Sequence, residues 1–338
     1  MDRTIDNPSI NASQPETVSV RSRERMPKEI WPNFFIVGAP RAGTTSLYEY
    51  LRRVPGIYMS PAKEPRYFAP GVAERYRGRP RGRPRLLFAR DSKVRSQAEY
   101  LNLFKSVKDE IAVGEASVSY LSYPEAPGRI KKAVPEARII MILRDPVERS
   151  YSHYLLNMSA GWQRAPFEEA ARLDLYLEPS RYANQVQRYL DVFGPDHVKV
   201  LIFEEFIQEP RKTVSAVLKF LGVNAEPPAV VGGAYNSFTI PRWPFVGRFL
   251  RSRPVRIARR LLIPARIRLT MRQQVLYRKA SKPPMPEKTR RFLEDAFRGD
   301  VQRLEQILGR SLPWFDARDQ LAKDQDERTT GGTSHAHR

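Results

Sequence analysis

The sequence predicts an α/β fold of the P-loop type, in which helices cover both faces of a central parallel sheet. Short apolar runs of strand length are each followed by a segment whose apolar residues have helical spacing, the order expected of parallel β-α-β units. The first strand–helix junction also has the glycine spacing of a loop that binds phosphate. No internal repeat suggests a different architecture.

Three apolar runs are candidates for buried parallel strands. The first covers 34–37 and stops at Gly38, the second covers 139–143 and stops at Arg144, and the third covers 198–203. Each run is almost continuously apolar, as expected of a strand that is buried on both faces.

Helical patterns follow these runs. One begins at Thr44, and a second begins after Asp145, which has the cap position, a proline next to it and Glu148 three residues later. A third helix is expected around 211–221. The last, from about 286 to 308, carries a single apolar stripe.

Composition limits the class of protein. The chain has 338 residues, a formal net charge of +21 and no cysteine, so it has no disulfide and no cysteine-based metal site. No apolar run is long enough to span a bilayer. We expect a polar leader over 1–30, one domain over 31–316 and a polar tail over 317–338, in a cytoplasmic protein. The charge implies an acidic partner.

Residues 38–47, GAPRAGTTSL, have the spacing G-x-x-x-x-G-[KST]-[ST] of a nucleotide phosphate loop. Gly38 and Gly43 let backbone N–H groups turn inward on an anion, and the helix that follows adds its dipole. Thr44 stands where the usual lysine would be. Because that lysine reaches the transferring phosphate, its absence argues against ATP chemistry. Arg41 supplies a cation instead.

A second anion site is predicted at the end of the next strand. Arg144 ends that strand and Ser152 lies two turns into the following helix, so together they can hold one phosphate through charge-assisted bonds. The sequence shows no magnesium-binding acid beside either site. Two anion sites at neighbouring strand ends therefore suggest a nucleotide phosphorylated at both ends, bound without a metal.

These motifs resemble those of the sulfotransferases that use 3′-phosphoadenosine 5′-phosphosulfate (PAPS). The segment 40–47 resembles their 5′-phosphosulfate loop and 143–154 their 3′-phosphate motif. The resemblance runs from about 33 to 315 and is closest to the branch of bacterial, heparan-sulfate and protein-tyrosine sulfotransferases. It continues, in order and with matching spacing, through KEPRYF (63–68), GEASVSYL (114–121), VKVLIFEEF (198–206), KPPMPEKTR (282–290) and LGRSLPW (308–314).

The resemblance implies a set of residues that bind the nucleotide. The 3′-phosphate would be held by Arg144 and Ser152, and the adenosine covered by Tyr189 and the basic segment near 278–282. The 5′-phosphosulfate would be wrapped by Arg41, Ala42, Gly43, Thr44, Thr45 and Ser46.

A base must remove the proton of the acceptor hydroxyl. None of the four histidines is well placed: two lie in the tail, His197 precedes a strand, and His153, within a helix, is expected either to pack or to face solvent. A carboxylate is therefore indicated. The resemblance gives this role to Glu64, because the glutamate of the matching motif is the base in the glycan and tyrosine branch.

Four further residues are expected to contact the acceptor. Lys63 and Arg66 flank Glu64, while Glu115 and Ser117 are expected after the next strand, lining the same cleft. Heparan-type members usually carry lysine where this chain has Ala116, which argues against a heparan-like acceptor. The leaving phosphate then depends on Arg41, with Lys63 as the alternative cation.

Two basic segments lie outside these motifs. Residues 75–85, RYRGRPRGRPR, could be a solvated loop, a grip on an acidic acceptor or a DNA-binding arm. Residues 241–286 hold thirteen Lys or Arg and no Asp or Glu. They suit either a contact with an anionic membrane or acidic substrate, or a core-facing stripe with a basic outer face.

The sequence thus predicts transfer of the sulfuryl group of PAPS, in line, to an acceptor hydroxyl, releasing 3′-phosphoadenosine 5′-phosphate (PAP). Glu64 is the base and Arg41 the leaving-group cation. A glycan or glycolipid acceptor is favoured, with other lipids, phenols and peptides open. Two alternatives remain: a non-catalytic protein binding nucleic acid or an anionic membrane, and an ATP-dependent phosphotransferase.

Overall fold

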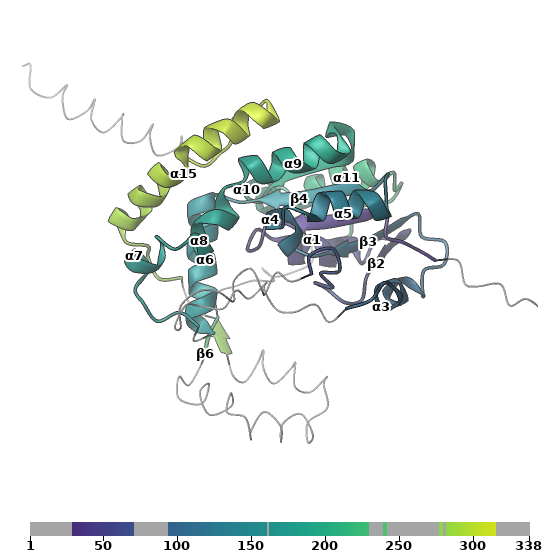
Figure 1. Ribbon diagram of the computed structural model, residues 1–338, viewed down its shortest axis with the longest axis horizontal. Helices are drawn as coiled ribbons and strands as arrows, with labels where there is room; N and C mark the ends of the chain where they lie inside the picture. Colours follow the sequence, from purple (N-terminus) through teal and green to yellow (C-terminus); the bar gives the residue numbers. More distant parts are fainter. Residues whose placement is uncertain are drawn as a thin grey trace, which may run out of the picture.

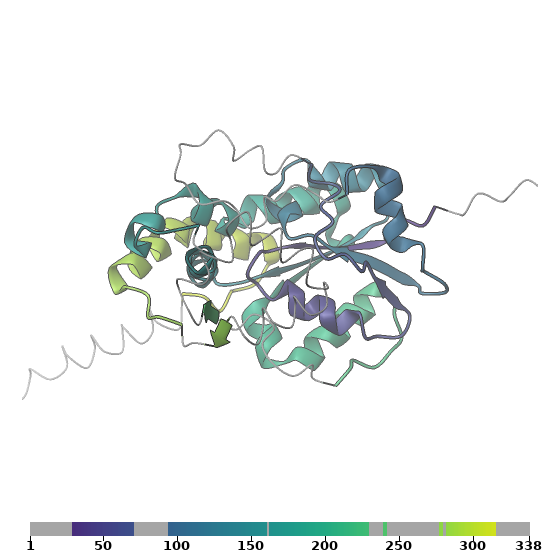
Figure 2. The same ribbon diagram turned by 90° about the horizontal axis from the view of Figure 1, so that it is seen from below.

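The computed structural model describes residues 29–70, 94–160, 162–229, 239–241, 277–279 and 282–315. Its centre is a five-stranded parallel sheet in the order β2-β3-β1-β4-β5 (Figures 1 and 2). The five strands are β1 (Phe34–Gly38), β2 (Ile57–Met59), β3 (Ala112–Ala116), β4 (Arg138–Leu143) and β5 (Val198–Ile202). Phe34 of β1 pairs with Gly114 of β3 on one side and with Arg138 of β4 on the other, so β1 is the central strand.

Helices cover both faces of the sheet. On one face α1 (Thr44–Leu51) packs with α11 (Pro210–Leu221), and on the other α5 (Ala126–Ala133) packs with α9 (Ala183–Phe193) (Figure 2). The long α15 (Glu287–Leu308) lies across α9 and α6 (Pro146–Ser159) at the outside of the molecule (Figure 1). The predicted fold class is therefore confirmed.

The remaining elements are short. An antiparallel pair, β6 (Thr239–Pro241) and β7 (Tyr277–Lys279), stands apart from the main sheet. The other helices are α3 (Gln97–Leu101), α4 (Ser119–Ser122), α7 (Phe167–Ala170), α8 (Asp174–Leu177) and α10 (Phe203–Gln208), and the 3₁₀ turns are Asn102–Phe104, Glu178–Ser180 and Pro195–His197.

The core is built on β1, all of whose residues are buried. Continuous apolar sequence is what a strand needs when helices cover it on both sides. Its neighbour β3 carries Gly114, where a Cβ atom would come within 2.1 Å of the Phe34 ring. Glycine at this position therefore allows the aromatic ring of β1 to lie against the backbone of β3.

The predicted helix starts and ends agree with the structure. The carboxylate of Asp145 accepts hydrogen bonds from the backbone N–H groups of Val147 (2.8 Å) and Glu148 (3.0 Å), so it caps α6 as expected. The helices expected at 211–221 and 286–308 are α11 and α15.

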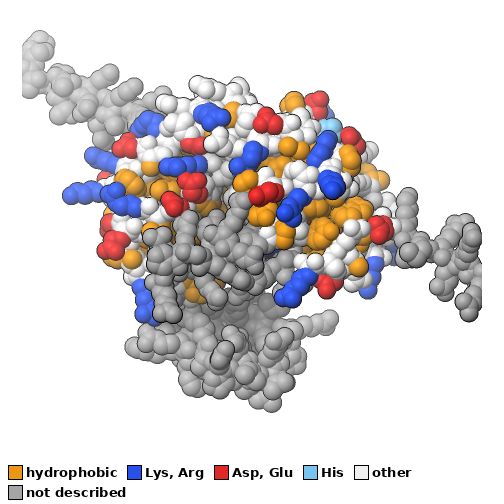
Figure 3. Space-filling model, viewed as in Figure 1, with side chains coloured by type: hydrophobic (Ala, Val, Ile, Leu, Met, Phe, Trp, Pro, Cys, Tyr) orange, Lys and Arg blue, Asp and Glu red, His pale blue; other side chains and the backbone are white. Residues whose placement is uncertain are grey.

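Several predicted segments lie outside the described residues. They are 75–85, the tail 317–338, nearly all of the leader 1–30 and most of 241–286. No helix in the described ranges is long and apolar enough to cross a membrane. On the face shown in Figure 3, Lys and Arg side chains are interspersed with Asp and Glu over the described surface, so the positive charge does not form one patch there.

Candidate functional site

The loop between β1 and α1 has the shape of an anion cradle. Gly43 and Arg41 both have left-handed backbone conformations, with φ of 86° and 72°. Glycine is needed at position 43 because a Cβ atom there would also lie 2.9 Å from the Phe203 ring. Helix α1 begins at Thr44 with no acidic residue in its first turn and no side-chain cap. Its N-terminal N–H groups and dipole therefore remain available to a bound anion.

The two predicted anion motifs meet at Arg41. The Nε–H of Arg41 donates to Ser152 Oγ at 3.0 Å, although 111 positions separate the two residues. Arg144 Nη1 donates to the backbone oxygen of Arg41 at 3.2 Å. Burial, and then the charge of Arg144, lower the pKa of Arg41 to about 10, which leaves its guanidinium charged at neutral pH.

Arg144 has a donor that no described residue satisfies. Its guanidinium lies 4.7 Å from the centre of the Phe203 ring, and its Nε atom is buried with no hydrogen-bond partner among the described residues. An unsatisfied buried donor is costly, and a bound anion would remove that cost. The predicted partners Arg41, Arg144 and Ser152 are thus brought together with spare hydrogen-bonding capacity.

A third arginine, Arg149, lies near Arg41 and Arg144, and its role here was not predicted from the sequence. The side chain of Arg149 is fully buried in α6, where Nη2 donates to the backbone oxygen of Tyr176 at 2.7 Å and Nε to Ser180 Oγ. Its Nη1 has no partner among the described residues. Burial is the main cause that lowers the pKa of Arg149 to about 10. An arginine inside an ordinary helical pattern gives no sequence signal of this placement.

Glu148 joins the nucleotide motif to the C-terminal helix. It accepts hydrogen bonds from Lys282 and from Arg290 Nη2 (2.6 Å), and lies 3.8 Å from Arg144 Nη2. Burial alone would raise the pKa of Glu148, but the bonds from Lys282 and Arg290 outweigh it and lower the pKa to about 2. Lys282 also lies 4.7 Å from the Tyr151 ring centre. This cluster, Glu148 with Lys282 and Arg290, is called the α15 brace below.

Glu64 lies on a loop that is hydrogen-bonded to the end of β3. Its backbone N–H donates to Ala116 O at 2.9 Å, and its side-chain Oε2 accepts from the N–H of Val118 at 3.1 Å. Lys63 Nζ lies 3.1 Å from Oε1 and Arg66 Nε lies 3.5 Å from Oε2. The two predicted flanking cations therefore both contact the predicted base, which keeps partial exposure to solvent.

Glu115 does not line an open cleft, contrary to the sequence-based expectation. It lies inside β3 rather than after it, and both Glu115 and Ser117 are fully buried. Its carboxylate accepts from Tyr120 OH (2.7 Å), Ser117 Oγ (2.9 Å) and Tyr100 OH (3.1 Å). Burial raises its pKa to about 7, against the opposing effect of these hydrogen bonds. Direct contact with an acceptor is therefore excluded in this geometry.

Tyr189 is likewise placed differently from the expectation. It is fully buried in α9, donates from its hydroxyl to Tyr120 O at 3.0 Å and stacks on Phe193. It is therefore a core residue that is not available to cover an adenosine. His153 is buried against Tyr176 rather than facing solvent, and burial lowers its pKa well below the usual value. His197 lies 3.3 Å from Glu136, away from these groups.

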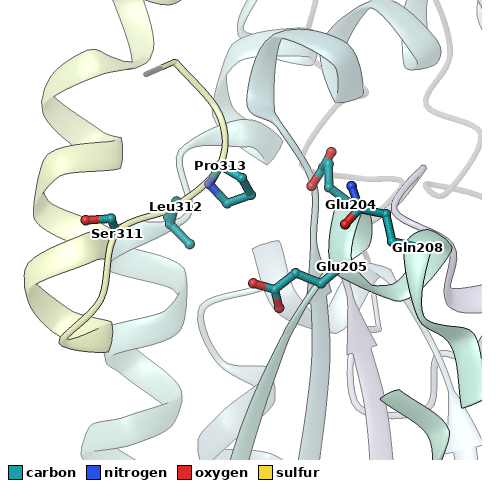
Figure 4. Close-up of a pocket in the computed structure, with 6 residues that line it drawn as sticks. All are labelled: Glu204, Glu205, Gln208, Ser311, Leu312 and Pro313. Carbon is teal, nitrogen blue, oxygen red and sulfur yellow. The ribbon is translucent and has the colours of Figure 1, made fainter. Parts of the chain in front are cut away.

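A pocket of about 340 Å³ opens beside the nucleotide motif (Figure 4). Glu204, Glu205 and Gln208 of α10 face the segment 311–313 across it. Glu204 accepts from the backbone N–H of Asp145 (3.2 Å) and from Trp314 Nε1 (3.1 Å), so it supports the start of α6. None of the predicted site residues lines this pocket. No group of three or more potential metal ligands occurs within the described ranges.

Comparisons with known proteins agree with these motifs. Residues 32–227 match the family described as "Sulfotransferase family". The chain is 30% identical over 211 residues to human bifunctional heparan sulfate N-deacetylase/N-sulfotransferase 3, covering 57% of this chain and 22% of that protein. It is 27% identical over 257 residues to mouse carbohydrate sulfotransferase 15, covering 57% of this chain and 44% of that protein. The chain thus spans less than half of either relative.

A solved structure is also similar over most of the chain. The sulfotransferase from Alicyclobacillus acidocaldarius is 31% identical and superimposes with a TM-score of 0.62, covering 84% of this chain and 98% of that one. The match therefore extends beyond residues 32–227 and includes nearly the whole of the solved protein.

Proposed function

This chain belongs to the sulfotransferase family, and from that premise we propose that it transfers the sulfuryl group of PAPS to a hydroxyl of a carbohydrate or glycolipid. The acceptor oxygen forms a bond to sulfur, while the bond from sulfur to the 5′-phosphate oxygen breaks. The electron pair stays on that phosphate, which leaves as part of PAP. The proton of the acceptor passes to a base. The domain that carries this activity is proposed to be 31–316, including the basic segment 241–286.

The observation that carries the proposal is that Arg41, Arg144 and Ser152 lie together and that one donor, Arg144 Nε, is buried with no partner in the part of the chain that the structure describes. Arg144 bonds to the backbone oxygen of Arg41, whose side chain bonds to Ser152. We assign the 3′-phosphate to Arg144 and Ser152. The 5′-phosphosulfate is assigned to the N–H groups and hydroxyls of 41–46. Arg41 lies between the two and neutralises the charge that develops on the leaving phosphate.

Glu64 is proposed as the base. It is the carboxylate of its cluster that keeps access to solvent, and the pair Lys63 and Arg66 holds it in one orientation. These two cations also suit an anionic acceptor. A base must lie within hydrogen-bond reach of the proton that it removes, and the partial exposure of Glu64 permits such contact.

The acceptor class rests on the relatives. The names of the two relatives above refer to heparan sulfate and to carbohydrate, so a sugar is the first acceptor to test, whether through a hydroxyl or an amine. A peripheral contact with an anionic membrane through 241–286 would suit a glycolipid acceptor, and this too is a proposal.

The donor site is tested by calorimetric titration of the full chain with PAP, ADP and ATP with magnesium. We expect PAP to bind at least about tenfold more tightly than ADP, without magnesium. Arg144→Ala should abolish this preference, whereas Arg181→Ala, which removes an exposed arginine paired with Glu178, should not. A preference for ATP with magnesium would instead support a phosphotransferase. Folded protein that binds DNA or anionic vesicles but no nucleotide would support the non-catalytic alternative.

Transfer is tested with PAPS labelled on sulfur and a panel of acceptors: unsulfated heparosan, chondroitin, a neutral glycolipid and p-nitrophenol. We expect label in one of the carbohydrate acceptors. Glu64→Gln should bind PAP as the wild type does and lose turnover. Full turnover in Glu64→Gln would remove the base assignment while leaving the donor site intact.

A further inference from the structure

We propose that Glu115 is a positioning residue for the base: an ionised carboxylate, buried in β3, that holds the loop 64–68 in the conformation in which Glu64 can act. This inference rests on the proposed role of Glu64. Glu115 itself touches neither donor nor acceptor, since it is fully buried.

Three hydroxyl groups from different elements converge on Glu115. Tyr100 from α3 and Tyr120 from α4 donate to Oε1, and Ser117 donates to Oε2. A carboxylate accepts all three bonds through its two oxygens, whereas an amide would present an N–H donor in place of one of these oxygens. The three donors therefore favour the ionised form and oppose the effect of burial.

The same hydroxyls hold the loop that carries the base. Ser117 Oγ accepts from the backbone N–H of Arg66 at 3.1 Å, and Tyr120 OH accepts from the N–H of Phe68 at 3.2 Å. Each of these two hydroxyls donates a hydrogen bond to Glu115 and accepts one from a backbone N–H of the loop. Glu115 thus fixes the direction in which both hydroxyls point, and their free lone pairs face the amides of 66 and 68.

The loop needs such support because its backbone is strained. Glu64 and Arg66 both have left-handed conformations, with φ of 63° and 59°, which side chains other than glycine and asparagine rarely adopt. A strained segment keeps its conformation only when its surroundings determine it. The amides of residues 64, 66 and 68 are bonded to Ala116, Ser117 and Tyr120, so one side of the loop is held throughout.

Charge makes the support depend on pH. The titratable groups facing Glu115 are Tyr100, Tyr120, Tyr189 of α9 and Glu64 itself. Burial raises the pKa of Glu115 to about 7, and the charge of Glu64 adds to this shift. Below that pH Glu115 gains a proton, loses its charge and accepts hydrogen bonds from the three hydroxyls more weakly. The hydrogen bonds that fix the loop 64–68 should therefore weaken as the pH falls below about 7, within the range in which enzymes are commonly assayed.

The first test follows the loop and needs no acceptor. Amide hydrogen exchange is measured on the full chain for 64–68 and, as an internal reference, for β5. In Glu115→Gln we expect exchange in 64–68 to be at least about tenfold faster, with β5 unchanged. Ser117→Ala should act in the same direction at 66, and Tyr58→Phe, whose hydroxyl donates to Leu103 O elsewhere, should change neither segment. Unaltered exchange of 64–68 in both Glu115→Gln and Ser117→Ala would overturn the inference.

The second test follows turnover with the panel acceptor that the wild type sulfates fastest. Glu115→Gln should lower kcat about tenfold per PAP-binding site, leave PAP affinity and the KM for PAPS unchanged, and shift the acid limb of the pH–kcat profile. A structural role alone would reduce the number of PAP-binding sites without moving that profile. Wild-type kcat and profile in Glu115→Gln, with Glu64→Gln inactive, would overturn this inference alone. Turnover in neither the wild type nor any variant would instead count against the proposed function.

Discussion

The two ends of the candidate site treat buried charge in opposite ways. At the nucleotide end, the buried Arg149 lies near the partly buried Arg41 and Arg144, and two of the three keep donors without partners within the described ranges. At the other end, Glu115 has three hydroxyl donors arranged around it. Under the proposed function a bound phosphate would complete the first end, whereas both carboxylate oxygens of Glu115 already have hydrogen-bond donors from the protein.

The difference indicates which end of the site gains stability when a ligand binds. Like charges repel in a medium of low polarity, so burial and neighbouring arginines lower the pKa values of Arg41 and Arg149. A phosphate dianion would relieve this repulsion. At the carboxylate end, neutral hydroxyls satisfy the charge without cancelling it, which preserves a fixed geometry before any ligand arrives.

The largest effect is expected from removing Arg41, the cation that is proposed to lie between the two phosphate groups of the nucleotide. Arg41→Ala should reduce kcat/KM for PAPS by roughly 100-fold or more, because a donor to the developing charge is lost. The ligand-free protein should melt no lower than the wild type, since a repelling charge has been removed. Steady-state kinetics and thermal melting check both parts. A lowered melting temperature with unchanged kinetics would mean that Arg41 serves the fold and not the ligand.

The carboxylate end is probed by the pH dependence of stability. The pKa of Glu115 rises from an ordinary 4.5 to about 7 on folding, so between these values the folded chain binds a proton that the unfolded chain has lost. The free energy of unfolding should therefore fall as pH rises from 4.5 to 7, by on the order of 3 kcal/mol from this group.

Urea unfolding of Glu115→Gln over the same pH range provides the measurement. The decline should be smaller in this variant by about that amount. Glu226→Gln, which changes a carboxylate exposed on the surface, serves as the matched control and should follow the wild type. Equal declines in all three proteins would show that Glu115 stays protonated, or stays charged, throughout.

The smallest effect is expected at the α15 brace. Arg290→Ala removes the 2.6 Å bond to Glu148 and leaves that carboxylate with Lys282 and Arg144 as its cations. We expect PAP affinity to fall a fewfold and the free energy of unfolding to drop by about 1 kcal/mol. The neighbouring Arg291→Ala, whose exposed side chain pairs with Glu287, should change neither. Identical titration curves for both variants would separate α15 from the nucleotide end.

The nucleotide end was easier to predict from the sequence than the carboxylate end, for physical reasons. The strand β1 and all of β4 after its first residue, Arg138, are apolar because both their faces are buried. Their carboxyl ends are adjacent in a parallel sheet, so the loop with Arg41 and the pair Arg144 and Ser152 were expected at neighbouring strand ends. The assignment of β3 was harder, since AVGEA contains a glycine and a charge within five residues.

Burial of particular side chains could not be inferred from local pattern. Glu115 is stabilised by tyrosines from α3 and α4, and the core position of Tyr189 depends on how α9 packs against α4. The burial of Arg149 could not be predicted either, because its hydrogen-bond partners Tyr176 and Ser180 lie far away in the sequence. The burial of each of these side chains results from tertiary packing, so it could not be predicted from the spacing of residues in the sequence.

The central position of β1 has a consequence for synthesis on the ribosome. Phe34 of β1 pairs with Gly114 and Arg138, so the most apolar strand emerges long before either neighbour exists. During that interval its backbone edges and aromatic side chains have no native partner, which is the condition under which nascent chains aggregate. A chaperone that holds 34–38 until β4 has emerged should therefore raise the yield of this protein more than one that acts after release.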